Sequence, residues 1–152
     1  MQIRSGNLAT IRQAVQDALL AKIEAARATG EPLEEVASVH MGDKAHVGDL
    51  NLPAVWVLPA PYMPIQRGGH TAEHPMAYDI AVLVHGDDPG VGRTDALDLA
   101  ARCYDVLLAD RTLGGEVHDV RGVRVDPAFR AAEGPLVYWA SVQVECVVRR
   151  RE

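Results

Sequence analysis

Residues 86–94, with the sequence GDDPGVGRT, have several features of a loop that binds phosphate. They follow an apolar segment and precede an amphipathic one, and the backbone N–H groups at the start of a helix attract anions. Three details argue against a nucleotide site. Asp87 takes the place of the first glycine, Arg93 replaces the lysine, and Asp88 adds a second charge that repels phosphate. The preferred interpretation is a turn that leads into a helix, and nucleotide binding is the alternative.

The segment 70–74, His-Thr-Ala-Glu-His, brings two imidazoles and a carboxylate together at short spacing. Such groups are common ligands of zinc. The segment lies among prolines and glycines, however, where no helix would hold the three side chains in a convergent arrangement. A solvated loop is therefore the preferred interpretation. The histidines at positions 40, 46, 85 and 118 stand singly.

The remaining acidic residues do not single out a catalytic pair. Asp79, Glu116 and Glu145 lie on or beside predicted strands. Asp110 ends an apolar run similar to a magnesium-binding strand, but the spacing of that run continues a helix. The sequence also lacks a G-x-S-x-G elbow, an H-E-x-x-H helix and a quartet of Cys and His ligands. We therefore predict no catalytic, cofactor-binding or metal-binding residue, and we expect a protein that is not an enzyme.

Length and composition indicate one compact domain, residues 1–152. The chain has 48% hydrophobic and 24% charged residues, and a domain of this size can fold without disulfides or metals. Its formal charge of −6 argues against direct nucleic-acid binding, which needs clustered Lys and Arg. Cys103 and Cys146 stand at apolar positions, so we expect buried thiols. No segment approaches the ~20 apolar residues that cross a bilayer, and no signal peptide is recognised, which predicts a location in the cytoplasm or in a particle assembled there.

Two amphipathic helices are predicted. The first has an apolar stripe from Leu8 to Ile23, with Asn7 as its N-cap and Gly30 at its end. The second begins after the turn 86–92, is capped by Thr94 or Asp95, and ends at a left-handed stop formed by the glycines at 114 and 115. Each apolar stripe needs a surface to cover, which we expect to be a sheet.

Five segments alternate or are continuously apolar in the manner of strands. They are Glu35–His40, Ala54–Leu58, Tyr78–His85, Val117–Val125 and Leu136–Val148. Tyr78–His85 is apolar on both faces, so we place it in the middle of the sheet. The predicted fold is α+β: a single mixed or antiparallel sheet with an N-terminal helix, a second helix packed on it, and a long loop between two strands.

The long loop covers residues 59–76. It contains four prolines and the pair Gly68-Gly69, which disfavour regular structure. Loops of this length are uncommon in compact domains and are often functional or disordered. Because Tyr62, Met63 and Ile65 add apolar groups, we interpret the loop as a mobile arm that contacts another protein.

The order of these elements resembles the tail terminator proteins of long-tailed phages and related particles. The residues that carry the resemblance are IRQAVQDALLAKI (11–23), YDIAVLVHG (78–86), DALDLAARCYDVLLADRTLGG (95–115) and LVYWASVQVECVV (136–148). Together they cover most of the chain. The stop DRTLGG at 110–115 is the most distinctive piece.

The resemblance implies a structural virion protein that caps the tail tube as a homo-hexameric ring. Such a protein ends tail polymerisation and joins the tail to the head and neck. Its partners would be the tail tube protein and a neck or head-completion protein, with DNA only as passing cargo. Its place would be the head-proximal end of the tail, assembled in the host cytoplasm.

Eight residues are the candidate interface. Five belong to the predicted loop and three form the basic cluster near the end of the sequence: Tyr62, Met63, Ile65, Arg67, His70, Arg149, Arg150 and Arg151. A solubilising tail is the preferred interpretation of the basic cluster, and a patch for an acidic partner is the alternative. The alternatives for the whole protein are a neck stopper or tail-completion protein of the same particle, and a small nucleotide- or metal-dependent hydrolase.

Overall fold

The computed structural model describes residues 3–41, 51–86, 88–130 and 137–152. It contains two helices, α1 (Leu8–Ala25) and α2 (Pro89–Leu108), and one sheet of six strands. The strands are β1 (Ser38–Met41), β2 (Ala54–Ala60), β3 (Ile65–Gln66), β4 (Thr71–His85), β5 (Asp119–Arg130) and β6 (Val137–Arg151). The predicted α+β class, with an N-terminal helix on a single sheet, is confirmed.

The sheet is mixed, with the order β1-β2-β4-β6-β5 and β3 paired to the outer part of β4. Only β1 and β2 run parallel, and the other pairs are antiparallel. β4 and β6 form the centre and pair without a break from Thr71–Arg151 to His85–Val137. The predicted central strand, residues 78–85, is therefore the inner half of a longer one.

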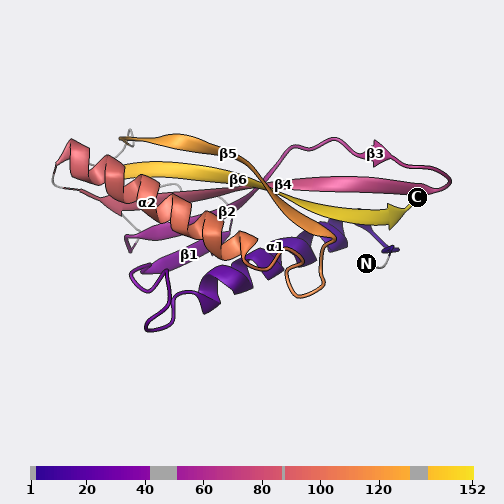
Figure 1. Ribbon diagram of the computed structural model, residues 1–152, viewed down its shortest axis with the longest axis horizontal. Helices are drawn as coiled ribbons and strands as arrows, with labels where there is room; N and C mark the ends of the chain where they lie inside the picture. Colours follow the sequence, from indigo (N-terminus) through magenta and orange to yellow (C-terminus); the bar gives the residue numbers. More distant parts are fainter. Residues whose placement is uncertain (1–2, 42–50, 87, 131–136) are drawn as a thin grey trace.

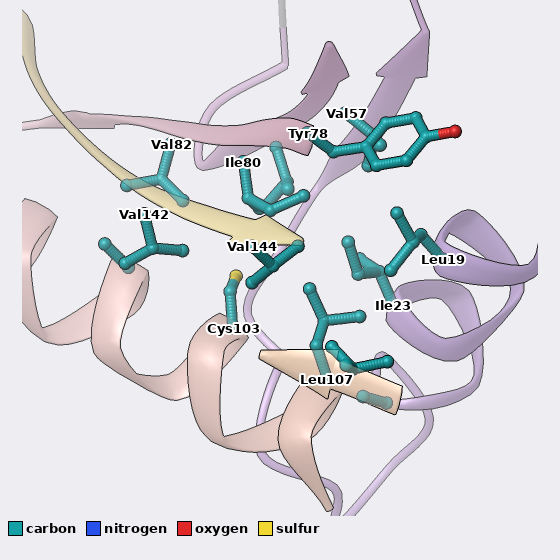
Figure 2. Packing of buried hydrophobic residues seen from close by; sticks show 14 of the residues in the cluster. Leu19, Ile23, Val57, Tyr78, Ile80, Val82, Cys103, Leu107, Val142 and Val144 are labelled. Carbon is teal, nitrogen blue, oxygen red and sulfur yellow. The ribbon is translucent and has the colours of Figure 1, made fainter. Parts of the chain in front are cut away.

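Both helices cover the same face of this sheet (Figure 1). Alternate residues of β4 and β6, among them Ile80 and Val142, point toward Cys103 and Leu107 of α2 (Figure 2). Leu19 of α1 enters the same cluster from the side (Figure 2). Both cysteines are buried as free thiols, as predicted. Within the described residues, the opposite face of the sheet carries no helix, and we call it the outer face.

The first helix begins as predicted. The Asn7 side chain accepts hydrogen bonds from the backbone N–H of Ala9 at 2.8 Å and of Thr10 at 3.3 Å, so it satisfies two of the free donors at the start of α1. The predicted end at Gly30 is wrong, because α1 stops at Ala25. Gly30 has a positive φ of 85°, but it serves the turns that follow the helix.

The second helix begins earlier than predicted. Asp88 is the N-cap of α2, and its carboxylate accepts from the N–H of Gly90 and of Val91. Pro89 starts the helix because its fixed φ suits the first turn and its missing N–H is not needed there. Thr94 and Asp95 are thus interior residues of α2. The helix ends at Leu108, and the positive φ values of Leu113, Gly114 and Gly115 belong to the turns beyond it.

The segment 59–76, predicted as a loop, is mostly β structure. β2 continues to Ala60, β3 occupies residues 65–66, and β4 starts at Thr71. Pro59 and Pro75 are tolerated because each has a strand partner on one side only: β1 ends opposite Val57, and Pro75 lies between the parts of β4 that pair with β2 and with β3. A residue without an N–H fits such one-sided positions. The glycines at 68 and 69 form the β3–β4 turn, where Gly69 has a φ of 66°.

β3, the first half of β4 and the second half of β6 form an extension that reaches past the C-terminal end of α2 (Figure 1). We call this extension, residues 62–76 and 146–152, the arm. Arg4 adds a short parallel bridge to Arg150 at its edge. Both ends of the described chain therefore lie at the arm, and the N-terminal end of α2 lies at the opposite end of the molecule (Figure 1).

Candidate functional site

A chain of polar side chains on the helix-side face holds the strands of the arm together. The Tyr62 hydroxyl and His74 Nδ1 are joined by a hydrogen bond of 2.9 Å, and His74 Nε2 is joined to Glu152 Oε1 at 2.9 Å. His74 is almost completely buried. The Arg150 guanidinium pairs with Glu152 at 2.8 Å and donates to the Gly6 carbonyl at 3.0 Å. These contacts order the C-terminal residues instead of leaving them as a solvated tail.

Arg12 of α1 supports the base of the arm. Its guanidinium donates to the carbonyls of Ala60 at 2.6 Å and Ala77 at 3.1 Å. The same group lies over the rings of Tyr62 and Tyr78, 5.0 and 5.1 Å from their centroids. Burial raises the pKa of both tyrosines although the nearby Arg12 charge lowers it. Both phenols therefore stay neutral and available as hydrogen-bond donors.

The outer face of the arm contains a hollow of about 500 Å³. Its lining residues are Ile3, Arg67, Thr71, Glu73, Arg121 and Arg149, and we call it the arginine hollow. Glu73 is only 5% exposed, and its carboxylate lies 3.4 Å from the Arg67 guanidinium and 3.8 Å from that of Arg149. Because two guanidiniums share one carboxylate, the hollow keeps an excess of positive charge.

The segment 70–74 is therefore not a solvated loop. His70 is exposed in the β3–β4 turn, whereas Glu73 and His74 are buried in β4. Successive strand residues point to opposite faces, so Glu73 enters the arginine hollow and His74 enters the tyrosine network. The two histidines and the carboxylate do not converge on one point.

The structure brings the eight predicted interface residues together on the arm, but in different roles. Met63 is 80% exposed and Ile65 is 42% exposed. Arg67 and Arg149 line the arginine hollow, whereas Tyr62 and Arg150 hold the arm in place. Arg151 is the partner of Thr71 in the β4–β6 ladder, and the backbone carbonyl of His70 accepts a hydrogen bond from the backbone N–H of Glu152. The prediction of a solubilising tail at 149–151 is wrong, because these residues belong to β6.

The glycines of segment 86–94 allow close packing. A Cβ added to Gly92 would lie 2.8 Å from Cγ of Tyr138 and nearer still to two other ring atoms. A Cβ on Gly86 would lie 2.6 Å from the Gly92 Cα and 3.1 Å from the same ring. The Asp88 carboxylate already occupies two N–H groups that a phosphate would need. These contacts explain why a glycine-rich sequence stands here and support the interpretation as a helix entry.

Asp110 stabilises the turns after α2. Its carboxylate accepts from the N–H of Thr112 at 3.3 Å and of Gly114 at 2.8 Å, and it pairs with Lys22 of α1 at 2.8 Å. The hydrogen bond from Lys22 and those from the backbone lower the pKa of Asp110 to about 2. Asp110 therefore links the turns after α2 to α1 through its ion pair with Lys22. Its carboxylate is engaged in these contacts and is not a free ligand for magnesium.

The other acids do not form a catalytic pair in the described part of the chain. Asp79 lies on the outer face, where one of its carboxylate oxygens is buried without a hydrogen-bond partner among the described residues and burial raises its pKa. Asp126, on the same face, accepts from the Ser141 hydroxyl at 2.8 Å. Glu116 pairs with Arg4 at 3.1 Å. Among the residues that the structure describes, no group of three or more His, Cys, Asp or Glu side chains could hold a metal ion.

Sequence reasoning considered Glu73 only as a possible zinc ligand, and it missed both the pairing of Glu73 with Arg67 and Arg149 and the tyrosine network. The alternation of residues 71–78 was the available signal, because buried Ala72, His74, Met76 and Tyr78 occupy every second position. The prolines and glycines masked that signal.

The arm thus combines exposed apolar side chains with two guanidiniums that share one carboxylate. No helix in the described ranges is long and apolar enough to cross a membrane. No family model matches the chain, and a search of curated proteins gave no match.

Proposed function

We propose that this chain is a tail terminator of a long-tailed phage or a related particle. In this role it forms a hexameric ring on the end of the tail tube, stops tube growth and presents a surface to the neck. The proposal rests on the resemblance of segments 11–23, 78–86, 95–115 and 136–148, together with the arm.

The arm is the observation that carries the proposal. A ring subunit needs a part that reaches its neighbour or the tube while its own core stays closed. In this chain the core lies between α1, α2 and the inner sheet, and the arm extends past α2 with Met63 and Ile65 exposed (Figure 1). The network from Tyr62 to Glu152 joins the strands of the arm, and Arg12 of α1 supports its base, so the arm is ordered before any partner binds, which lowers the entropic cost of assembly.

The charge distribution is compatible with DNA as passing cargo. The formal net charge is −6, so the positive charge of the arginine hollow is local and the rest of the surface is acidic on balance. An acidic surface repels the phosphate backbone and would not retain DNA that moves through the ring.

The test is tube capping. Purified tail tube protein is polymerised with and without this chain, and tube length and tube ends are imaged by electron microscopy. We expect shorter tubes with a ring at one end. Tubes of unchanged length with bare ends would contradict the proposal. Binding to capsids but not to tubes would identify a neck stopper or tail-completion protein.

A matched pair of variants ties capping to the arm. Met63→Asp with Ile65→Asp places two charges on exposed arm positions, whereas Asp105→Lys changes the charge at an exposed position of α2, outside the arm. We expect the first variant to fold normally and to lose capping, and the second to cap as the wild type does. Normal capping by the arm variant would remove the arm from the proposed mechanism.

A further inference from the structure

The end of the molecule opposite the arm carries a second hollow, of about 460 Å³. It lies between α2 and the ends of β2 and β4, and its charged residues include Glu35, Asp95 and Asp98, so we call it the acidic hollow. Arg102 also lines it and pairs with Glu35 and with Asp98. The Asp95 side chain makes no ion pair or hydrogen bond with the described residues. The acids therefore outnumber the cation, and the hollow carries negative charge.

Exposed apolar side chains accompany both hollows. Val91 of α2 is 56% exposed and stands four residues before Asp95 and seven before Asp98, so it lies on the same side of the helix as both acids. In the arm, Ile65 faces outward beside Glu73, its partner in the β3–β4 ladder, and Ile3 lines the arginine hollow. Each end thus combines one sign of charge with apolar contacts, and the signs are opposite.

We propose that copies of this chain associate head to tail, with the arginine hollow of one copy against the acidic hollow of the next. Arg67 and Arg149 would face Asp95 and Asp98, and the isoleucines beside the arginine hollow, Ile3 and Ile65, would contact Val91. The occupant is a second copy because the chain itself supplies both complementary surfaces. Opposite charges steer such an encounter and fix its register, and the apolar contacts add affinity.

A contact between two different surfaces is heterologous. A bound pair leaves one arginine hollow and one acidic hollow free. The same contact can therefore repeat until a ring closes or a filament grows. The inference rests on the proposed function only for the number of subunits. It names the surfaces through which a ring would form.

Charge exchange tests the contact. The arm variant is Arg67→Glu, Glu73→Gln and Arg149→Glu, in which the Glu73 change prevents repulsion between the new acids and the buried carboxylate. The helix variant is Asp95→Lys with Asp98→Lys. Self-association is measured by sedimentation velocity at low and high salt, and thermal melting confirms that each variant folds.

We expect each variant alone to associate at least about a hundredfold more weakly than the wild type, since like charges then meet across the contact. An equal mixture should recover association, because every arm then finds an oppositely charged helix. Wild-type association should also weaken at high salt. Asp105→Lys, a charge reversal outside the acidic hollow, should leave association unchanged. Variants that associate like the wild type, or a mixture that does not recover, would overturn the inference.

Disulfide cross-linking detects the contact even where association is too weak for sedimentation. Ile65→Cys and Val91→Cys in one chain should give a ladder of oxidised multimers, and either substitution alone should give dimers at most. The absence of a ladder at high protein concentration counts against the contact.

Tube capping, measured in parallel, separates the two proposals. If the protein caps tubes but charge exchange leaves self-association unchanged, only the proposed contact is contradicted. Head-to-tail association without capping removes only the tail function.

Discussion

Tyr138 of β6 lies directly against the backbone of Gly92 in the first turns of α2. A Cβ at position 92 would be 2.8 Å from the ring carbon Cγ and closer to Cδ2 and Cε2. Tyr138 is buried and pairs with Val84 in the central ladder, so its ring has little free space to move into. The contact sets how closely α2 approaches the sheet.

Gly92→Ala should destabilise the protein. In an exposed helix interior, alanine is favoured over glycine by about 1 kcal/mol. Here the added methyl meets a buried ring, and such overpacking costs about 1–3 kcal/mol. Chemical denaturation should show a lower unfolding free energy. Gly90→Ala is the control, because its Cβ would meet only the Asp88 Oδ1 atom at 3.2 Å. Equal stability of the two variants would show that α2 adjusts without cost.

Tyr62→Phe should loosen the arm without unfolding the body. The change removes the hydroxyl that joins His74 Nδ1 and leaves a buried polar atom unpaired, which costs about 1–3 kcal/mol. Hydrogen exchange should become faster in residues 71–76 and 146–151 and stay unchanged in α2. Met63→Ala, at the exposed neighbour, should have no such effect. A uniform increase over the whole chain would mean that the arm and the body unfold as one unit.

The arm should be protected in the free protein. Backbone hydrogen bonds of a continuous β4–β6 ladder predict slow exchange from Thr71 to His85, whereas a flexible loop would exchange fast up to residue 76. Limited proteolysis should cut at the β3–β4 turn, residues 67–70, before any other arm site. Fast exchange throughout 71–76 in the isolated chain would restore the prediction of a mobile loop.

Stability should fall at low pH partly through Asp110. The pKa of this carboxyl is lowered to about 2 in the folded chain, from about 4 in an unfolded one. The lowered pKa means that the carboxylate stabilises the fold above the unfolded value, and that this contribution is lost as pH falls toward 2. Asp119, whose pKa the Arg111 hydrogen bond also lowers, acts in the same direction.

Asp110→Asn should flatten this pH dependence between about pH 4 and pH 2. At neutral pH it should cost about 1 kcal/mol or less, because the pair with Lys22 is exposed to solvent. Unfolding curves at a series of pH values provide the measurement. Asp17→Asn, an exposed acid on α1 without a lysine or arginine partner among the described residues, is the control. An unchanged slope in the Asp110 variant would assign the acid sensitivity to other carboxylates.

Local signals predicted the body of this fold well. The Asn7 cap, the apolar stripe of α1 and the core strand 78–85 depend on neighbours within a few residues, and each lies where it was predicted. The start of α2 was misplaced because Asp88-Pro89 was interpreted as a turn, although an acid followed by proline also suits a helix start.

The arm could not be derived from local pattern. Pro75, within the arm, and Pro59, just before it, fit in strands only because each lacks a second strand neighbour, which is a property of the whole sheet. The arginine hollow depends on the pairing of Glu73 with Arg149, and these residues are adjacent only through the β4–β6 register. Charges far apart in sequence gave no sign of that proximity.

The strand order has a consequence for synthesis. β6 lies between β4 and β5 in the sheet, yet it is the last of the six strands along the chain. While the ribosome is still making residues 137–151, β4 and β5 have no common partner, and the apolar sides of α1 and α2 have no complete sheet to cover. Pairing so distant in sequence is slow to form. We therefore expect the complete sheet to form only after β6 has left the exit tunnel, in a late step of folding.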